Sequence, residues 1–227
     1  MRNVGKKERA MVGGVIHRHW LQSVVVGFAF AILAAMLAPT ANAAAPGEEA
    51  EAFLQDLAVS GIAMLENDAY TEQQRELEFR EIVRKGFALQ AIGKFVVGRY
   101  WRDMSPGQQS EYQELFSEWL LKAYANRLGG YRGQTLEIVK SMETESRYRD
   151  VIVSTRLNRV SGQPAINADW RVRKFGDEYK IIDLSVEGAS MVGTQRKEFE
   201  SVIQKIGVDG LIDNLRSRLT MLMANTG

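Results

Sequence analysis

Carboxylate side chains are the strongest candidates for chemistry in this sequence. Asp169, Asp183 and Glu187 lie on or beside predicted strands, where two carboxylates held close together can act as a general acid and a general base. Alternatively, they are solvated charges that bind the ends of strands, and nothing in the sequence indicates a raised pKa. The role of the segment 187–190 is also open to two interpretations. The segment is an active-site loop, or a tight turn in which Gly188 adopts a backbone conformation that other residues resist.

Three arginines are candidates for binding an anion. Arg156, Arg171 and Arg173 are expected to form a basic band on the outer face of a predicted sheet. There they can bind a phosphate or an acidic partner, or they form an ordinary solvated surface, as charged side chains usually do.

The residues that the chain lacks exclude several classes of enzyme. It has no cysteine, and its two histidines, His17 and His19, lie in an N-terminal segment with the features of a signal peptide. Once that segment is removed, Ser-His-Asp and Cys-His catalysis and ordinary zinc or haem sites are excluded. We therefore predict a binding protein without catalytic residues, metal or cofactor, rather than an enzyme.

Residues 1–43 are predicted to be a signal peptide that is cleaved after Ala43. A basic region precedes an apolar stretch at 21–37, and Ala41-Asn42-Ala43 supplies the small residues that signal peptidase reads. The apolar stretch is slightly long, so an uncleaved anchor helix is the alternative. An exported chain of this size without disulfides suits the periplasm of a Gram-negative bacterium, which is the predicted location.

The predicted mature chain, 44–227, is large enough for one domain with a hydrophobic core. Residues 1–43 contain five of the 29 Lys and Arg residues and one of the 28 Asp and Glu residues, so the mature chain has a net charge of −3. This charge argues against a nucleic acid as a partner.

The element that must organise the rest is a long amphipathic helix from Ser105 to Tyr131. Ser105 suits the N-cap, Pro106 suits the first helical position, and Gly129 and Gly130 suit the end of the helix. Spacings of three and four residues place one apolar stripe on it, made up of Tyr112, Leu115, Phe116, Trp119, Leu120, Ala123, Tyr124 and Leu128. A stripe with four aromatic side chains needs an extensive apolar covering.

Further helices are predicted before and after a sheet region. Glu48–Glu66 carries apolar residues on one face, Thr71 begins a capping box for a second helix, and 87–101 is a third helical stretch. After the sheet, a helix that is capped by Thr194 and ends at Gly207 is followed by a last helix.

After the long helix, the pattern changes to a period of two. Apolar and polar residues alternate in 135–138, 151–157 and 166–173, and 179–186 is an apolar strand with two similar faces. Short turn segments favour consecutive antiparallel hairpins. The predicted fold is α+β, a curved four-stranded antiparallel sheet packed by the long helix and flanking helices. We place the sheet at about 134–187 and the helical parts at about 46–131 and 194–222.

Two blocks of residues resemble the MlaC family, the periplasmic component of toluene-tolerance or Mla-type lipid transport. The first contains Phe95-Val96-Val97-Gly98-Arg99-Tyr100-Trp101, Ser105-Pro106, Phe116, Leu120, Tyr124 and Tyr131. The second, more specific block contains Asp183, Glu187-Gly188-Ala189-Ser190-Met191, Arg196, Glu198-Phe199 and Gly207-Val208-Asp209-Gly210-Leu211. The blocks follow the family's order over nearly the whole mature chain, although the family more often has Val at position 189.

The resemblance implies a carrier of phospholipid between the two membranes of a Gram-negative envelope, a role linked to outer-membrane lipid asymmetry. The implied fold encloses a deep apolar cavity, with acyl chains inside and the headgroup near its mouth. The implied partners are an inner-membrane ABC lipid transporter complex and an outer-membrane lipoprotein. Three alternatives are a hopanoid-associated carrier of the same family, a structural periplasmic adaptor with a solid core, and a small enzyme that uses Asp183 or Glu187.

Seven side chains are expected to line such a cavity: Phe95, Phe116, Leu120, Tyr124, Val153, Trp170 and Ile182. If Val153 belongs to the lining, Val153→Trp is expected to reduce bound lipid without unfolding the protein. Because a solid core and a hollow one need the same apolar faces, the lining is a hypothesis at this stage. Headgroup preference, number of acyl chains, transport direction and oligomeric state stay open.

Overall fold

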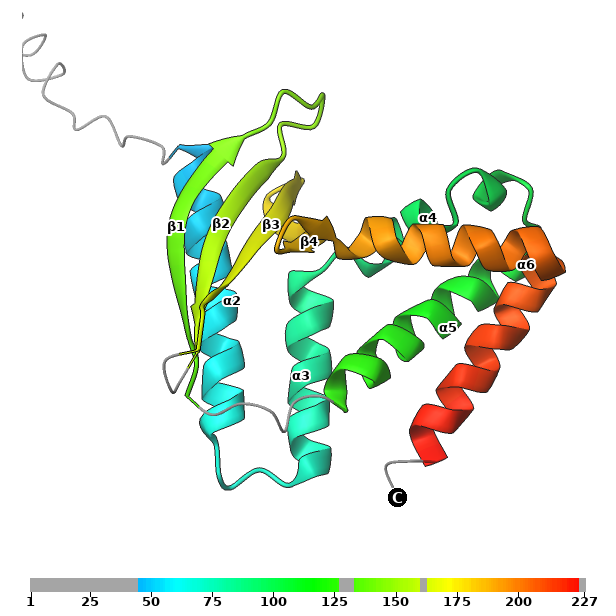
Figure 1. Cartoon of the computed structure of the whole chain (residues 1–227), viewed down its shortest axis with the longest axis horizontal. Helices are drawn as coiled ribbons and strands as arrows, with labels where there is room; N and C mark the ends of the chain where they lie inside the picture. Colours follow the sequence, from blue (N-terminus) through cyan, green and yellow to red (C-terminus); the bar gives the residue numbers. More distant parts are fainter. Residues whose placement is uncertain (1–44, 127–132, 160–162, 225–227) are drawn as a thin grey trace, which may run out of the picture. The chain divides into compact units, whose positions relative to one another are not determined.

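The computed structural model describes residues 45–126, 133–159 and 163–224. The described part begins with two helices, α2 (Pro46–Glu66) and α3 (Glu72–Gly86), which lie side by side (Figure 1). The Thr71 hydroxyl accepts a hydrogen bond from the Gln74 N–H (3.2 Å), and the Gln74 side chain accepts one from the Thr71 N–H (2.9 Å). This pair confirms the predicted capping box, which bonds N–H groups that the first turn of a helix leaves without partners.

The third helical stretch, predicted at 87–101, begins later and is divided into an α-helix and a 3₁₀ helix. Phe87 pairs instead with Ile181 of the sheet, and the helix α4 covers only Leu89–Val97. Gly98 ends α4 at a φ of 58°, a conformation that glycine adopts without steric strain. A 3₁₀ helix, η1 (Gly98–Arg102), follows and turns the chain toward the long helix.

The long helix α5 (Pro106–Ala125) begins where the sequence predicts. The Ser105 hydroxyl accepts a hydrogen bond from the Gln108 N–H (3.3 Å), and the Gln108 side chain accepts one from the Ser105 N–H (2.9 Å). The predicted end at Gly129 and Gly130 lies outside the described residues. Within α5, Tyr112 and Phe116 are almost completely buried.

The strands form one antiparallel sheet in the order β1-β2-β3-β4-β5. They are β1 (Thr135–Glu143), β2 (Val151–Asn158), β3 (Ile166–Phe175), β4 (Glu178–Val186) and β5 (Ala189–Ser190). The prediction of four strands was wrong, because β5 adds a short fifth strand. Glu187 and Gly188 form the two-residue turn before it with φ of 48° and 82°, and this pattern of two positive φ angles is typical of tight hairpins.

The helix α6 (Met191–Ala224) covers both helices that were predicted after the sheet, and it begins before the predicted cap at Thr194. Thr194 is not its cap. The Ser190 hydroxyl accepts a hydrogen bond from the Gly193 N–H (2.8 Å), whereas the Thr194 hydroxyl donates to the Ser190 carbonyl (2.8 Å). At Gly207 the φ of 76° and ψ of −179° are not helical, so α6 bends sharply there, as Figure 1 shows. The predicted break at Gly207 is therefore a kink between two helical segments.

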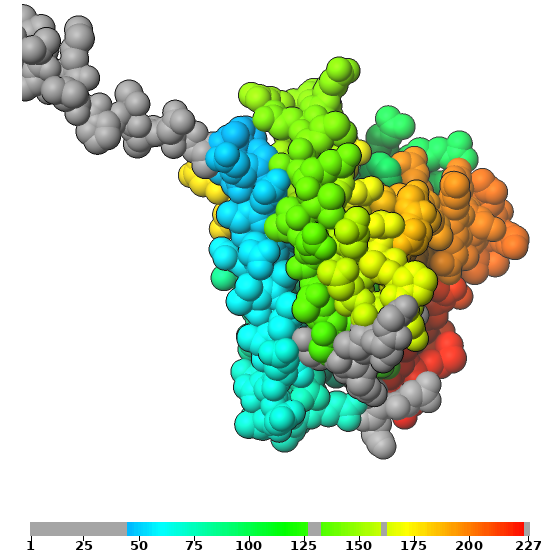
Figure 2. Space-filling model, turned by 60° about the vertical axis from the view of Figure 1, so that its left-hand side comes forward, coloured from blue at the N-terminus to red at the C-terminus, as the bar shows by residue number. Residues whose placement is uncertain are grey.

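Two clusters of buried residues form the core. One joins α4, α5 and α6 and contains Ile92, Val96, Tyr112, Phe116, Phe199 and Leu215, among others. The other joins α2 to the sheet and contains Ala50, Leu54, Val151, Val153, Val172 and Ile181. Figure 2 shows α2 beside the first strands of the sheet, and α3 contacts β4. The helices and the sheet thus each contribute a packed layer, and these layers position the site.

Candidate functional site

An apolar pocket of about 400 Å³ is lined by residues from both core clusters. Its wall is built from five helices, α2 to α6, and from strands β1, β3 and β4. Among the described residues, Asp183 is the one charged residue in the lining, and Gln195 is one of few other polar residues there. Such a wall offers apolar contact and little hydrogen bonding, so it suits a ligand with a large apolar part.

The wall contributed by α2 follows one face of that helix. Leu54, Leu57, Gly61 and Leu65 recur at spacings of three and four residues, which brings them to one side. Gly61 lies inside the helix, and a β-carbon added there would meet no atom within 4 Å. The missing side chain of Gly61 therefore leaves open space on the pocket wall.

Four of the seven expected lining residues lie in the pocket wall: Phe116, Leu120, Tyr124 and Trp170. The other three lie elsewhere. Phe95 is 52% exposed, with the Arg196 guanidinium 4.8 Å from its ring centre. Val153 is fully buried in the cluster between α2 and the sheet, so Val153→Trp is expected to disrupt packing and does not test the pocket.

Ile182 is the extra residue of a β-bulge. Val172 of β3 pairs with Ile181 of β4, whereas Arg171 pairs with Asp183, so Ile182 has no partner in the register. The bulge interrupts the alternation of faces, and both Asp183 and Leu184 contribute to the pocket. It also explains why the sequence of β4 shows two similar faces.

The sequence-based list of lining residues omitted the helices α2 and α3. From α3, Phe79, Ile82 and Val83 line the pocket together with the aromatic residues of α5. The signal was available, since Leu54, Leu57 and Leu65 form a visible stripe on α2. What the sequence lacked was the information that this stripe faces the same space as Phe116 and Trp170.

The candidate catalytic carboxylates each bind nearby main-chain or hydroxyl groups. Asp183 accepts hydrogen bonds from the Ser190 hydroxyl (2.6 Å) and from the N–H groups of Leu184 and Val192. Asp169 accepts from the Ser154 hydroxyl (2.6 Å), and Glu187 accepts from the Asn167 N–H (2.7 Å). These bonds hold the sheet to the start of α6 and brace the β4–β5 turn. The segment 187–190 is a tight turn followed by the two residues of β5.

The arginines of the predicted basic band are engaged with carboxylates. Arg171 and Arg173 bind Asp150, which is fully buried, at 2.8 and 2.7 Å. Burial raises the pKa of Asp150, but hydrogen bonds from Arg173 and Arg171 outweigh this effect and leave the pKa below its ordinary value. Arg156 lies 3.9 Å from Glu137. The band therefore mainly stabilises the sheet.

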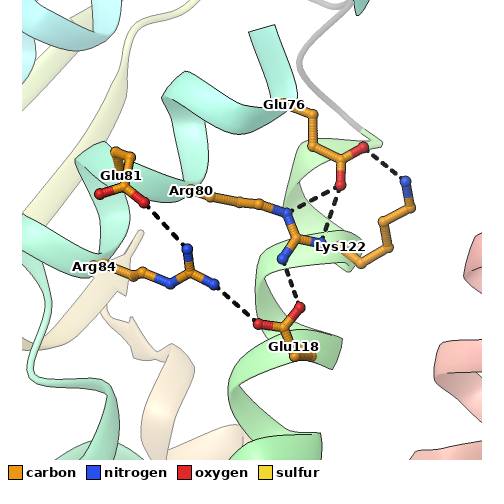
Figure 3. Close-up of polar contacts among 6 residues, drawn as sticks. All are labelled: Glu76, Arg80, Glu81, Arg84, Glu118 and Lys122. Atoms are coloured by element: carbon orange, nitrogen blue, oxygen red, sulfur yellow. Dashed lines mark hydrogen bonds and ion pairs between the residues drawn. The ribbon is translucent and has the colours of Figure 1, made fainter. Parts of the chain in front are cut away.

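A network of ion pairs connects α3 to α5, two helices that line the pocket (Figure 3). Glu118 of α5 accepts hydrogen bonds from Arg80 (2.6 Å) and Arg84 (3.1 Å) of α3. Lys122 of α5, which is only 8% exposed, donates to Glu76 of α3 at 2.7 Å. These three bonds therefore connect α3 to α5 on this side of the pocket.

Acid is expected to weaken this network. Burial raises the pKa of Glu76, but hydrogen bonds from Lys122 and Arg80 outweigh it, and the pKa lies below its ordinary value of 4.5. Because the folded-state pKa is depressed, the stabilisation is complete above the unfolded-state pKa and is lost as pH falls through the folded-state pKa. Urea unfolding at neutral and strongly acidic pH measures this loss. In Glu76→Gln the loss on acidification is expected to be smaller, and an equal loss would contradict the assignment.

The helices, the antiparallel sheet and the apolar pocket define an α+β protein with an apolar internal wall. A family model described as MlaC protein matches residues 55–217, so the chain belongs to the MlaC family. It is similar to the intermembrane phospholipid transport system binding protein MlaC of Haemophilus influenzae, with 26% identity over 133 residues. This match covers 56% of the chain and 60% of that relative's length.

The fold is shared with a solved structure. A phospholipid-binding protein from Ralstonia solanacearum, in complex with a phospholipid, aligns with a TM-score of 0.66 and 24% identity. The alignment covers 76% of this chain and 97% of that one. The resemblance that the sequence motifs indicate is confirmed at the level of the family, and the fold is shared with that solved structure.

Proposed function

We propose that the protein is a periplasmic carrier that binds phospholipid in the apolar pocket and shuttles it between the outer and inner membranes. One observation carries the proposal: this chain, which belongs to the MlaC family, has a pocket of about 400 Å³ with an almost entirely apolar wall. Sites for small ligands typically measure about 300–1,000 Å³. The names of the two related proteins, which refer to phospholipid transport and phospholipid binding, add support.

The energetics of lipid burial explain why such a carrier must be hollow. Two acyl chains with roughly thirty methylene groups gain about 24 kcal/mol when they leave water, at about 0.8 kcal/mol each. The tightest non-covalent complexes reach about 18–21 kcal/mol, so opening the pocket and ordering the lipid must offset part of this gain. Uncatalysed escape into water is therefore very slow, and release requires a partner that opens the pocket.

In this proposal, the protein is the soluble component of an ABC-type lipid transport system. Its partners are an inner-membrane ABC lipid transporter complex and an outer-membrane lipoprotein. The signal-peptide prediction for residues 1–43 supports the periplasmic location, although those residues lie outside the described part of the structure. The pocket favours this carrier over an adaptor with a solid core.

Native mass spectrometry of the protein, purified from a periplasm without detergent, tests the proposal. We expect a stoichiometric adduct of phospholipid mass that organic extraction removes. A hopanoid mass would reassign the protein to a hopanoid carrier. A ligand-free mass, combined with no uptake of phospholipid from vesicles, would overturn the carrier proposal in favour of an adaptor.

A further inference from the structure

The guanidinium of Arg196 is held in place but has no hydrogen-bond or ion-pair partner among the described residues. It lies over the Phe95 ring, and a β-carbon on Gly98 would come within 2.7 Å of one of its nitrogen atoms. Within the described ranges, Arg196 is half-buried and donates no hydrogen bond and forms no ion pair. A guanidinium has five N–H donors, and those of Arg196 are therefore available to a ligand or to water. A fixed, unpaired arginine of this kind is typical of a site that receives an anion.

A second arginine faces the same space. A pocket of about 150 Å³ is lined by Arg196, Arg99, Tyr100 and Glu200, together with Val96 and Val97. The Arg99 guanidinium lies 3.5 Å from Glu200 and donates to the Tyr100 hydroxyl at 3.0 Å. Among the lining residues, two positive groups face one carboxylate, so the lining carries an excess positive charge that favours an anionic group of modest size.

The polar pocket adjoins the apolar one. Val96 of α4 lines both pockets, and on α6 the adjacent residues Gln195 and Arg196 line the apolar and the polar pocket, respectively. In a phospholipid, the phosphate follows directly on the glycerol that carries the acyl chains. A lipid whose chains fill the apolar pocket has its phosphate just outside the pocket, and the polar pocket lies at one such edge.

We propose that Arg196, assisted by Arg99, is the phosphate subsite for the lipid bound in the apolar pocket, an inference that rests on the carrier function proposed above. Arginine suits this role because its planar fork makes two parallel hydrogen bonds to phosphate oxygens. The stacking on Phe95 orients the fork without using its N–H groups. The subsite distinguishes phospholipids from neutral lipids with the same chains.

The test compares uptake of a phospholipid and of a diacylglycerol with identical acyl chains, measured by native mass spectrometry of delipidated protein. We expect the wild-type protein to favour the phospholipid by about tenfold or more, as a charge-assisted hydrogen-bond pair allows. Arg196→Gln is expected to lose most of this preference while it still takes up diacylglycerol. Arg156→Gln, the same change on the sheet, is the matched control and is expected to keep the preference.

The outcomes distinguish a failure of the carrier proposal from a failure of the phosphate-subsite proposal. If the wild-type protein takes up neither lipid, the carrier function fails and the subsite fails with it. If it takes up both equally, or if Arg196→Gln keeps the preference, the subsite is wrong and the carrier stands. If Arg196→Gln keeps the preference but no longer binds the purified inner-membrane transporter, the site binds an acidic protein surface instead. Should Arg196→Gln not fold, Arg99→Gln replaces it, since that side chain is 64% exposed.

Discussion

Replacing Gly61 with phenylalanine is expected to remove most of the bound lipid while the protein stays folded. The added β-carbon meets no atom within 4 Å, so the ring enters the apolar pocket rather than the packed core. If the ring displaces only two methylene groups of a chain, binding weakens by about 1.6 kcal/mol, which is more than tenfold. Native mass spectrometry of protein purified from the periplasm measures the lipid content directly.

The stability of this variant is expected to be equal to or higher than that of the wild-type protein without lipid. Glycine inside a helix is about 1 kcal/mol less favourable than alanine, and Gly61 lies in the interior of α2. An apolar ring in an apolar pocket adds buried surface. Thermal unfolding of delipidated protein separates this effect from the loss of ligand.

Ala63→Phe is the matched control for Gly61→Phe. Ala63 lies on the same helix but is exposed and does not line the pocket. Its lipid content is expected to equal that of the wild-type protein. If Gly61→Phe retained a full complement of lipid, or if Ala63→Phe lost it equally, the apolar pocket would not be the lipid site.

Replacing Glu118 with glutamine is expected to destabilise the protein by about 2 kcal/mol and to speed lipid release. Glu118 accepts hydrogen bonds from both Arg80 and Arg84. These are two of the three bonds that connect α3 to α5. Arg80 is only 13% exposed, so its charge loses a partner that water replaces poorly. Urea unfolding of delipidated protein measures the change in the free energy of unfolding.

The effect on lipid release follows from the position of the bonds between α3 and α5. Both α3 and α5 line the pocket, so a movement that separates them opens it. If separation breaks the bonds to Glu118, a loss of about 2 kcal/mol raises the opening rate by about tenfold or more. The slow transfer of a fluorescent phospholipid from the loaded protein to vesicles, in the absence of any partner protein, measures this rate.

Glu81→Gln is the control, because Glu81 binds Arg84 but lies on the same helix and does not connect α3 to α5. Its side chain is 71% exposed, and exposed ion pairs contribute about 0–1 kcal/mol. Equal effects of the two substitutions on transfer would show that charge, rather than the link between helices, controls release. An unchanged transfer rate in Glu118→Gln would place the opening movement elsewhere.

Local sequence signals determined where most elements of this protein begin and what class of fold they form. The capping residues Ser105 and Thr71 bond to groups three residues away, so their function depends on a short stretch of chain alone. The alternation of apolar and polar residues likewise marks the strands through the geometry of a single strand. The family motifs added the expected ligand class, because the two blocks together run from Phe95 to Leu211 in the family's order.

The tertiary structure alone decided which apolar residues line a pocket and which fill a core. Val153 and Trp170 are direct partners in the β2–β3 register, yet Val153 is sealed beneath α2 while Trp170 faces the pocket. Both positions are apolar, and the difference depends on where the helices leave space. The bulge at Ile182 likewise depends on how separate segments pack. So does the bond between Lys122 and Glu76, which are 46 residues apart. Such features arise from contacts between distant segments, and no periodicity within one segment records them.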